Sequence, residues 1–428
     1  MLSRMEHDSI GALNVPAEAY YGVQSMRAAT NFQITHRPLH PVLIDSIVMV
    51  KKAAAITNEK SGKLDQQIAQ AIIQACDEIL DGNLRDQFIV DAIQGGAGTS
   101  ANMNANEVIA NRAIEILGGT KGDYSIVHPN DHVNMSQSTN DVIPTAGKIT
   151  VLKLLPQTIK ELEKLEKAME EKEAEFDDIL KMGRTQLQDA VPMRLGQSFG
   201  AFAHVLKRDI KRLKNVMDEM KVLNIGATAI GTAINVAPYY LANISYELSK
   251  VAGISLKQAD DLIDATQNLD GFVSVSGVLK TCAVDISKIS NDLRLMSFGP
   301  RTGLSEINLP ARQNGSSIMP GKINPVIPEV VSQVVYLIIG HDYTITMAAE
   351  AGQCEKYIEK SVGISTALCP YIGYAKSAEI AKKSLKTGIS VKELVLEEGL
   401  LKEEELKEIL KPEKMTQPMR EKVMKAVS

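Results

Sequence analysis

Residues 315–324 read Gly-Ser-Ser-Ile-Met-Pro-Gly-Lys-Ile-Asn, so two hydroxyls, a lysine and an amide lie between glycines and a proline. A serine hydroxyl is a poor base at pH 7. It removes a carbon-bound proton only where donors, desolvation and a cation stabilise its alkoxide. Gly315 and Gly321 allow backbone N–H groups to come close, and Lys322 supplies charge. The run favours a loop that makes an oxyanion of Ser316, although a Ser-Ser-x-Met-Pro run alone also fits an ordinary interhelical loop.

Four other blocks are rich in hydroxyl and amide side chains. They span residues 20–24, 94–104, 136–141 and 183–190. Together with the run 315–325, and in the same order, they resemble the blocks of the aspartase/fumarase superfamily. Members of that superfamily eliminate ammonia, water or an amine from succinyl-type substrates. The resemblance extends over nearly the whole chain.

The resemblance implies a role for each matching residue. Ser316 matches the catalytic base, and Lys322 and Asn324 match residues that complete the catalytic loop and bind a substrate carboxylate. The remaining matches contact the substrate: Thr99, Ser138, Thr139, Asn140, Thr185 and Ser317. Neutral hydroxyl and amide donors suit a dicarboxylate whose negative charge grows in the transition state. Taken singly, each hydroxyl is more often a helix cap or a turn former.

The choice among superfamily reactions depends on the block 183–190. Fumarases of this superfamily carry His after the threonine that corresponds to Thr185, whereas this chain has Gln186, which cannot titrate. The chain also has no Trp. We therefore expect an ammonia-lyase that converts L-aspartate reversibly to fumarate and ammonia through an aci-carboxylate. The alternatives are fumarate hydration, another elimination of the superfamily, or an inactive structural relative.

Apolar residues recur at helical spacing almost throughout, which predicts an all-α fold. Phe199, Phe202, Leu206, Ile210 and Leu213 continue one such pattern, which predicts a long amphipathic helix from residue 195 to about 220. Residues 159–178 are dense in Glu and Lys, which indicates a solvated helix face. The run 390–393, Ser-Val-Lys-Glu, predicts a capping box at the start of a short helix.

The resemblance implies three helical domains and a homotetramer whose active sites are each shared between chains. On this chain the domains are an N-terminal lyase domain at 1–138, a central bundle of long helices at 139–353 and a small C-terminal domain at 354–428. Relatives continue after the position of Gln353 with a further bundle helix, but here Gln353 is joined directly to Cys354. Roughly 40 residues are absent, enough for a helix of about 45 Å and its turns. Either the given sequence omits this segment, or the deletion is real; a real deletion would expose apolar faces of the bundle and favour an inactive relative.

The composition excludes several classes of partner. A net charge of −5 gives no reason to expect nucleic acid or an anionic membrane. The four cysteines show no C-x-x-C spacing, and the N-terminus lacks the apolar core of a signal peptide, so we expect a cytoplasmic protein. His128 and His132 have the spacing of a helical metal pair, but Pro129 argues against a helix there. We expect no metal and no cofactor, and a small dicarboxylate as the only ligand.

Overall fold

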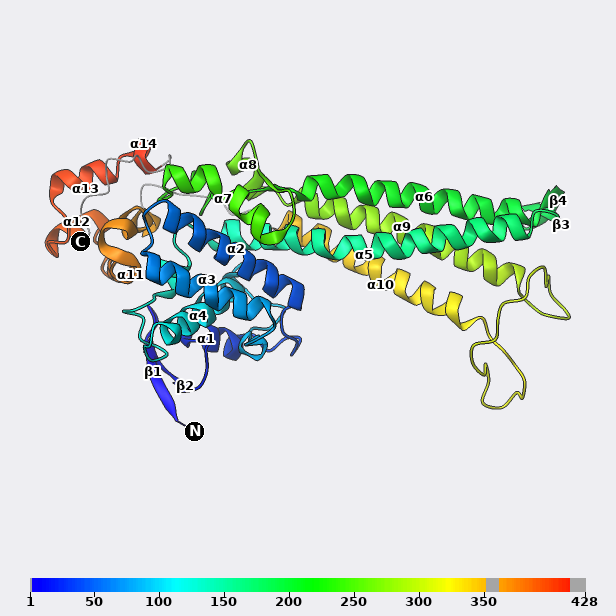
Figure 1. Cartoon of the computed structure of the whole chain (residues 1–428), viewed down its shortest axis with the longest axis horizontal. Coiled ribbons are helices and arrows are strands. Elements are labelled where there is room, and N and C mark those ends of the chain that lie inside the picture. Colours follow the sequence, from blue (N-terminus) through cyan, green and yellow to red (C-terminus); the bar gives the residue numbers. More distant parts are fainter. Residues whose placement is uncertain (1, 352–361, 416–428) are drawn as a thin grey trace. The chain divides into compact units, whose positions relative to one another are not determined.

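The computed structural model describes residues 2–351 and 362–415 (Figure 1). The chain divides into two compact units. Unit 1 comprises residues 1–151, 221–267 and 354–428, and unit 2 comprises residues 152–220 and 268–353. The predicted all-α class is confirmed, because the strands form only small two-stranded sheets. The predicted three-domain division stays a prediction.

Unit 1 begins with an antiparallel hairpin, β1 (Ser3–His7) and β2 (Ala12–Pro16), in which Ser3 pairs with Pro16 and His7 with Ala12. Its helices are α1 (Val23–Asn31), α2 (Pro41–Lys60), α3 (Gln66–Leu80), α4 (Thr99–Ile116), the start of α5 (Thr139–Glu175), α7 (Pro238–Ala252) and α8 (Leu262–Gln267). Short strands β5 (Val222–Leu223) and β6 (Lys257–Gln258) pair in parallel. Single helical turns span Arg85–Gln87 and Pro129–Val133.

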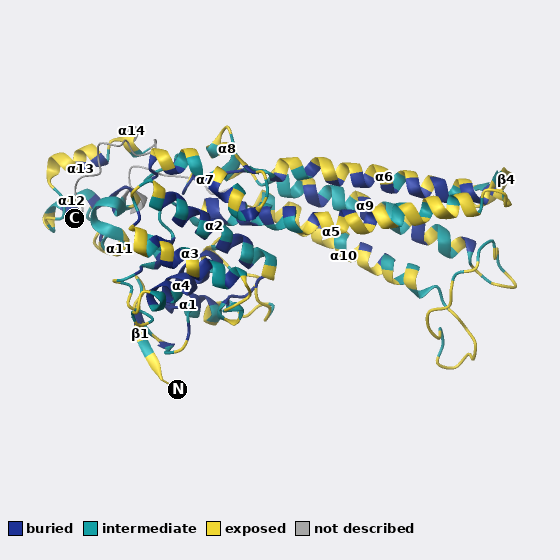
Figure 2. Cartoon of the chain, viewed as in Figure 1, coloured by how far each residue is buried: buried dark blue, intermediate teal, exposed yellow. Residues whose placement is uncertain are grey.

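The core of unit 1 forms where α2 packs on α3, α4 and α7. Ile47, Ile72, Ile109 and Tyr240, one from each of these helices, are fully buried, and Figure 2 shows the dark blue of buried residues concentrated here. Helix α4 is buried on almost every side, including its polar Asn102, as expected for a helix at the centre of a unit. A rigid α4 matters because its first residue is one of the predicted site residues.

The C-terminal part of unit 1 is a small helical assembly. It contains a 3-10 helix (Val362–Leu368), α11 (Cys369–Thr387), α12 (Val391–Glu397), α13 (Glu403–Ile409) and α14 (Pro412–Met415), which enclose an apolar cluster centred on Leu368, Ile380 and Leu394. The predicted capping box is confirmed: Ser390 Oγ accepts from Glu393 N, and the Glu393 carboxylate accepts from Ser390 N.

Unit 2 is a bundle of long helices. It contains the rest of α5, then α6 (Leu195–Met220), α9 (Asp270–Met296) and α10 (Val326–Glu350), and α9 packs against both α6 and α10. The predicted amphipathic helix is confirmed as α6. Strands β3 (Leu180–Thr185) and β4 (Gln188–Arg194) join α5 to α6 as an antiparallel hairpin. A Cβ atom on Gly200 would lie 2.1 Å from the Glu173 carboxylate, so glycine lets α5 and α6 approach.

Helix α10 leaves many apolar side chains exposed. They include Val330, Val334, Tyr336, Leu337, Tyr343 and Met347, and Leu337 is 58% exposed. A solvated helix of a monomer rarely carries so many large apolar residues on its surface. The described helices include none that is long and apolar enough to cross a membrane.

Candidate active site

The loop predicted to carry the base is closed by its own backbone. Gly315 N donates to Lys322 O at 2.8 Å, and Asn324 Nδ2 donates to Gly315 O at 3.1 Å. A Cβ atom on Gly315 would lie 2.7 Å from the Asn324 side chain, so only glycine fits. Gly321 has a φ of +77°, in the left-handed region that favours glycine. Both glycines and Asn324 therefore define the shape of the loop.

Ser316 lies inside this loop with its oxygen facing backbone donors. Its Oγ accepts from Met319 N at 3.0 Å and from Ile318 N at 3.3 Å. Two fixed N–H groups aimed at one hydroxyl oxygen stabilise negative charge on it, which is what a serine base requires. The side chains of Ser317 and Lys322 are exposed. In the parts of the chain that the structure describes, Lys322 forms no ion pair, so its ammonium is available to an anion.

Thr185 also belongs to unit 2 and lies at the tip of the β3–β4 hairpin. The turn that follows it, Gln186 and Leu187, has positive φ at both residues (53° and 63°), as a tight two-residue hairpin turn requires. Behind the tip, Arg184 pairs with Glu306 at 2.7 Å. Thr185 is exposed, and its position is fixed by the turn and by the ion pair of its neighbour.

The other predicted donors belong to unit 1 and lie at the starts of two helices. Thr99 is the first residue of α4, and Thr139 is the first residue of α5. Asn102, one turn into α4, donates from Nδ2 to Thr139 Oγ1 at 3.3 Å and so links the two starts. The N-terminus of a helix presents unsatisfied N–H groups and favours anions. Two such termini suit a carboxylate ligand.

Ser138 and Asn140 flank Thr139. Ser138 Oγ accepts from Asn140 N at 3.3 Å, and Asn140 Nδ2 donates to Ala229 O at 2.7 Å. The structure thus brings Ser138, Thr139 and Asn140 together beside the start of α4. The predicted site residues form two groups, one in each unit.

A buried carboxylate, which the sequence did not single out, supports this donor group. Asp141 Oδ1 accepts from Ser138 N at 2.8 Å, and Oδ2 accepts from Gly226 N at 3.1 Å and from Thr228 N at 3.0 Å. Burial raises the pKa of Asp141 to about 6, against the lowering effect of these three backbone donors. Asp141 therefore ties the turn at Ser138 to the loop 224–229. The sequence signal for this role is the position of Asp141 three residues after Ser138, the spacing at which an acidic side chain accepts from the backbone N–H of a helix-capping serine.

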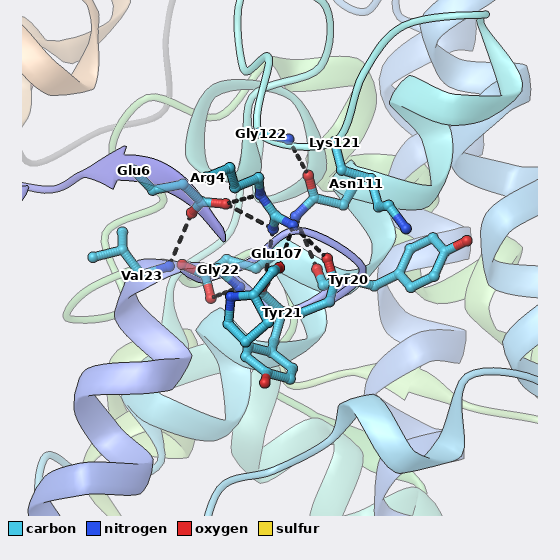
Figure 3. Close-up of polar contacts among 12 residues, drawn as sticks. Arg4, Glu6, Tyr20, Tyr21, Gly22, Val23, Glu107, Asn111, Lys121 and Gly122 are labelled. Carbon is cyan, nitrogen blue, oxygen red and sulfur yellow. Dashed lines mark hydrogen bonds and ion pairs between the residues drawn. The ribbon is translucent and has the colours of Figure 1, made fainter. Parts of the chain in front are cut away.

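The block 20–24 fixes the first helix of the chain to α4. Glu107, buried on α4, accepts from Gly22 N at 2.9 Å (Figure 3). The same oxygen accepts from Ser25 N at 3.0 Å, and the other oxygen accepts from Gln24 N at 2.9 Å. A carboxylate at the start of α1 satisfies N–H groups that have no partner within the helix. Burial raises the pKa of Glu107 to about 7, against the hydrogen bonds from Ser25 and Gln24. This block has a structural role.

His128 and His132 form hydrogen bonds within their own segment. Contrary to the prediction, a helical turn does begin at Pro129, because proline is well tolerated at the first position of a helix. His128 Nδ1 accepts from the backbone of Asn130 and Asp131, and His132 Nδ1 accepts from His128 N at 2.9 Å. Burial lowers the pKa of both imidazoles. No cluster of three metal-ligating side chains occurs among residues 2–351 and 362–415.

Comparisons with known proteins extend these observations. A family model described as Lyase matches residues 11–340, and one described as Fumarase C C-terminus matches residues 364–417. The chain is 49% identical to the aspartate ammonia-lyase of Bacillus subtilis, with 97% of this chain and 96% of that protein covered. It is 46% identical to the aspartate ammonia-lyase of Escherichia coli, with the same coverage. The alignment with the Bacillus protein runs over 457 positions, so that relative has residues with no counterpart among the 428 of this chain.

Solved structures agree with the sequence comparisons. A crystal structure named fumarate lyase:delta crystallin from Brucella melitensis, bound to cobalt, matches with a TM-score of 0.81 at 47% identity, covering 97% of this chain and 100% of that one. A class II fumarase from Schistosoma mansoni matches with a TM-score of 0.79 at 32% identity, covering 97% of this chain and 99% of that one. The chain therefore belongs to the aspartase/fumarase superfamily of lyases.

Proposed function

We propose that this chain is an aspartate ammonia-lyase, which converts L-aspartate reversibly to fumarate and ammonia. The observation that carries the proposal is the Ser316 hydroxyl held by two backbone N–H groups in a loop that also presents Lys322. Aspartate ammonia-lyases at 46–49% identity over nearly the full chain support the choice of substrate. Gln186, where fumarases of this superfamily carry His, supports elimination of ammonia rather than of water.

The residues divide the chemistry in the following way. The Ser316 alkoxide takes the proton from the carbon beside the β-carboxylate, and the electron pair of that C–H bond moves into the carboxylate, giving a dianionic aci-carboxylate. Lys322, Ser317 and Asn324 bind the carboxylate on which this charge develops. The electron pair then returns to form the C=C bond while the C–N bond breaks. Ammonia leaves, and Ser316 retains the proton until it passes to solvent.

The second group of donors holds the substrate in place. Thr99 and Thr139 stand at helix starts, where the backbone favours an anion, and Ser138 and Asn140 add hydroxyl and amide donors. Thr185 of unit 2 adds one further hydroxyl. Because the carboxylate on which charge grows is assigned to the loop, these donors hold a part of the substrate whose charge changes little, and they chiefly set affinity. We assign no metal ion and no cofactor to the reaction, since these side chains supply both the base and the anion binding.

We propose that the enzyme is a cytoplasmic homotetramer whose active sites are shared between chains. The exposed apolar residues of α10, including Tyr336, Leu337 and Tyr343, support burial of this helix against other copies. The buried free thiols of Cys76 and Cys282 favour a reducing compartment. Because this chain lacks residues that its relatives have, assembly of the tetramer is the first step to verify.

The test combines activity with mass. Purified full-length protein is mixed with L-aspartate or with L-malate, fumarate is followed by its absorbance at 240 nm, and the oligomer is weighed by light scattering in the same buffer. Fumarate from aspartate alone, formed by a tetramer, is the expected result. Fumarate from malate alone would identify a hydratase. A monomer or an aggregate without activity on either substrate would identify an inactive relative.

A further inference from the structure

Lys51, on the inner side of α2, is a lysine with no exposed surface. Its Nζ donates to Asn134 Oδ1 at 2.7 Å and to Gln137 Oε1 at 3.0 Å, and both acceptors are neutral amides. Within the described residues no carboxylate forms an ion pair with it. Lysine is almost never fully buried unless it is paired, because the loss of hydration is costly. The arrangement therefore calls for a role that an apolar residue could not fill.

The two amides that Lys51 holds precede the substrate donors in the same segment, since Gln137 is next to Ser138 and Asn134 lies four residues before it. Asn134 Oδ1 also accepts from Asn102 Nδ2 at 3.2 Å, and the same nitrogen of Asn102 donates to Thr139 Oγ1 at 3.3 Å. Asn134 Nδ2 in turn donates to Gln137 O at 3.2 Å, which closes the turn that ends at the next residue, Ser138. A continuous chain of hydrogen bonds thus runs from Lys51 to the hydroxyl of Thr139.

The protonation state of Lys51 does not alter this arrangement. Burial lowers the pKa of Lys51 to about 7, and the charge of Asp141 opposes that effect. Two N–H donors are enough for Asn134 and Gln137, and both the ammonium and the neutral amine have them. The contacts persist on either side of neutral pH.

We propose that Lys51 is a positioning residue for substrate binding: through Asn134 and Asn102 it sets the orientation of Ser138 and Thr139 toward a dicarboxylate. The inference rests on the proposed function, since it deepens the role of the same donor group. A buried lysine with a purely structural role would stabilise the fold without affecting how tightly the correctly folded enzyme holds substrate. The two roles therefore differ in which kinetic constant they move.

The test replaces Lys51 by an apolar side chain of similar length. In Lys51→Met both donated hydrogen bonds are lost, and we expect KM for L-aspartate to rise about tenfold or more while kcat changes much less, because binding interactions common to both states are weakened. The matched control is Lys52→Met. Lys52 is the next residue on α2, it pairs with Asp77 of α3, and its loss leaves the contacts of Asn134 intact. The control is expected to keep the wild-type KM.

A purely structural role predicts a different outcome. Partial misfolding of Lys51→Met lowers the concentration of active enzyme, so the measured kcat falls while KM stays at the wild-type value. That result overturns the inference. Mass and thermal unfolding, measured on the same samples, show how much of each variant is folded and assembled.

Asn102→Leu decides the matter if Lys51→Met does not fold. Asn102 Oδ1 is buried without a partner among the residues described, so an apolar residue of the same shape removes an unsatisfied group along with the link to Thr139. We expect Asn102→Leu to fold and to show a raised KM. An unchanged KM in this variant overturns the proposed route.

The wild-type enzyme separates this inference from the proposed function. If the wild type releases no fumarate from aspartate, the proposed function fails by itself. Affinity for succinate, a dicarboxylate that cannot eliminate, is then measured by isothermal titration calorimetry on the wild type, Lys51→Met and Lys52→Met. Weaker succinate binding in Lys51→Met alone supports the inference, and equal binding in all three proteins overturns it.

Discussion

The two groups of site residues are built in different ways. The loop around Ser316 is closed by contacts within ten residues of sequence, and most of its side chains are exposed. The donor group at residues 138–140 rests on two fully buried polar side chains, Lys51 and Asp141, whose hydrogen bonds join distant parts of the chain. The first group makes a reactive oxygen from local backbone geometry, whereas the second derives its geometry from the core of unit 1.

This difference separates chemistry from binding. Changes in the loop should alter the reaction and leave the stability of unit 1 unchanged. Changes in the support of the donor group should alter stability and affinity together, because buried polar groups lose hydrogen bonds that water cannot replace.

Ser316→Ala removes the proposed base. We expect kcat to fall by about 10²–10⁴-fold, the range typical of a lost general base, with the unfolding temperature close to wild type because the side chain lies in an exposed loop. Steady-state kinetics and thermal unfolding on the same preparation check both parts. Wild-type turnover in this variant would assign proton removal to another group.

Gly315→Ala distorts the loop without removing a reactive group. The added Cβ would lie 2.7 Å from the Asn324 side chain and 2.8 Å from its backbone N, so the loop must shift. A displacement of this kind can cost about 10²-fold in rate. The control is Gly321→Ala, which has open space around its Cβ and loses only about 1–2 kcal/mol through its positive φ. Equal kcat values for the two variants would show that the close approach at Asn324 is not needed.

Asp141→Asn tests the buried support. An amide NH₂ in place of one carboxylate oxygen leaves at least one of the N–H groups of Ser138, Gly226 and Thr228 without an acceptor. Each buried unsatisfied group costs about 1–3 kcal/mol, so we expect a lower midpoint of unfolding in urea. The exposed Asp86→Asn is the control and should match the wild type. A wild-type midpoint for Asp141→Asn would contradict the supporting role.

The pH dependence of stability should reveal Lys51. Burial lowers its folded-state pKa from 10.5 to about 7, so between these values the unfolded chain holds a proton that the folded chain lacks. The contribution of this group to the free energy of unfolding is thus fully present above pH 10.5 and is lost as the pH falls through 7. The free energy of unfolding of the wild type, measured relative to that of Lys51→Met, should therefore rise with pH by up to about 1.4 kcal/mol per pH unit. Urea unfolding at pH 7 and pH 9 measures it, and a pH-independent difference would contradict the assignment.

The sequence predicted those features that depend on neighbouring residues. The helix at 195–220, the capping box at Ser390 and the composition of the Ser316 loop each lie within a short stretch, so spacing and residue type were sufficient. The prediction against a helical turn at Pro129 was wrong, because proline is compatible with the first position of a helix even though it disfavours later ones.

The buried support could not be predicted in the same way. Lys51 and Asn134 are 83 residues apart, and Asp141 and Thr228 are 87 residues apart, so no local pattern pairs them. In the sequence, Lys51 is one of two adjacent lysines on a helix, and nothing there indicates that it is buried whereas Lys52 reaches solvent. Only the packing of α2 against α3, α4 and α7 distinguishes them.

The most direct test of the division is the affinity for succinate in two variants, Ser316→Ala and Thr139→Val, measured by isothermal titration calorimetry alongside turnover of L-aspartate. We expect Ser316→Ala to bind succinate as tightly as the wild type and not to turn over L-aspartate, whereas Thr139→Val should bind succinate more weakly and retain a measurable kcat. Loss of succinate binding in Ser316→Ala, or unchanged binding in Thr139→Val, would contradict the assignment of chemistry to the loop and of affinity to the helix starts.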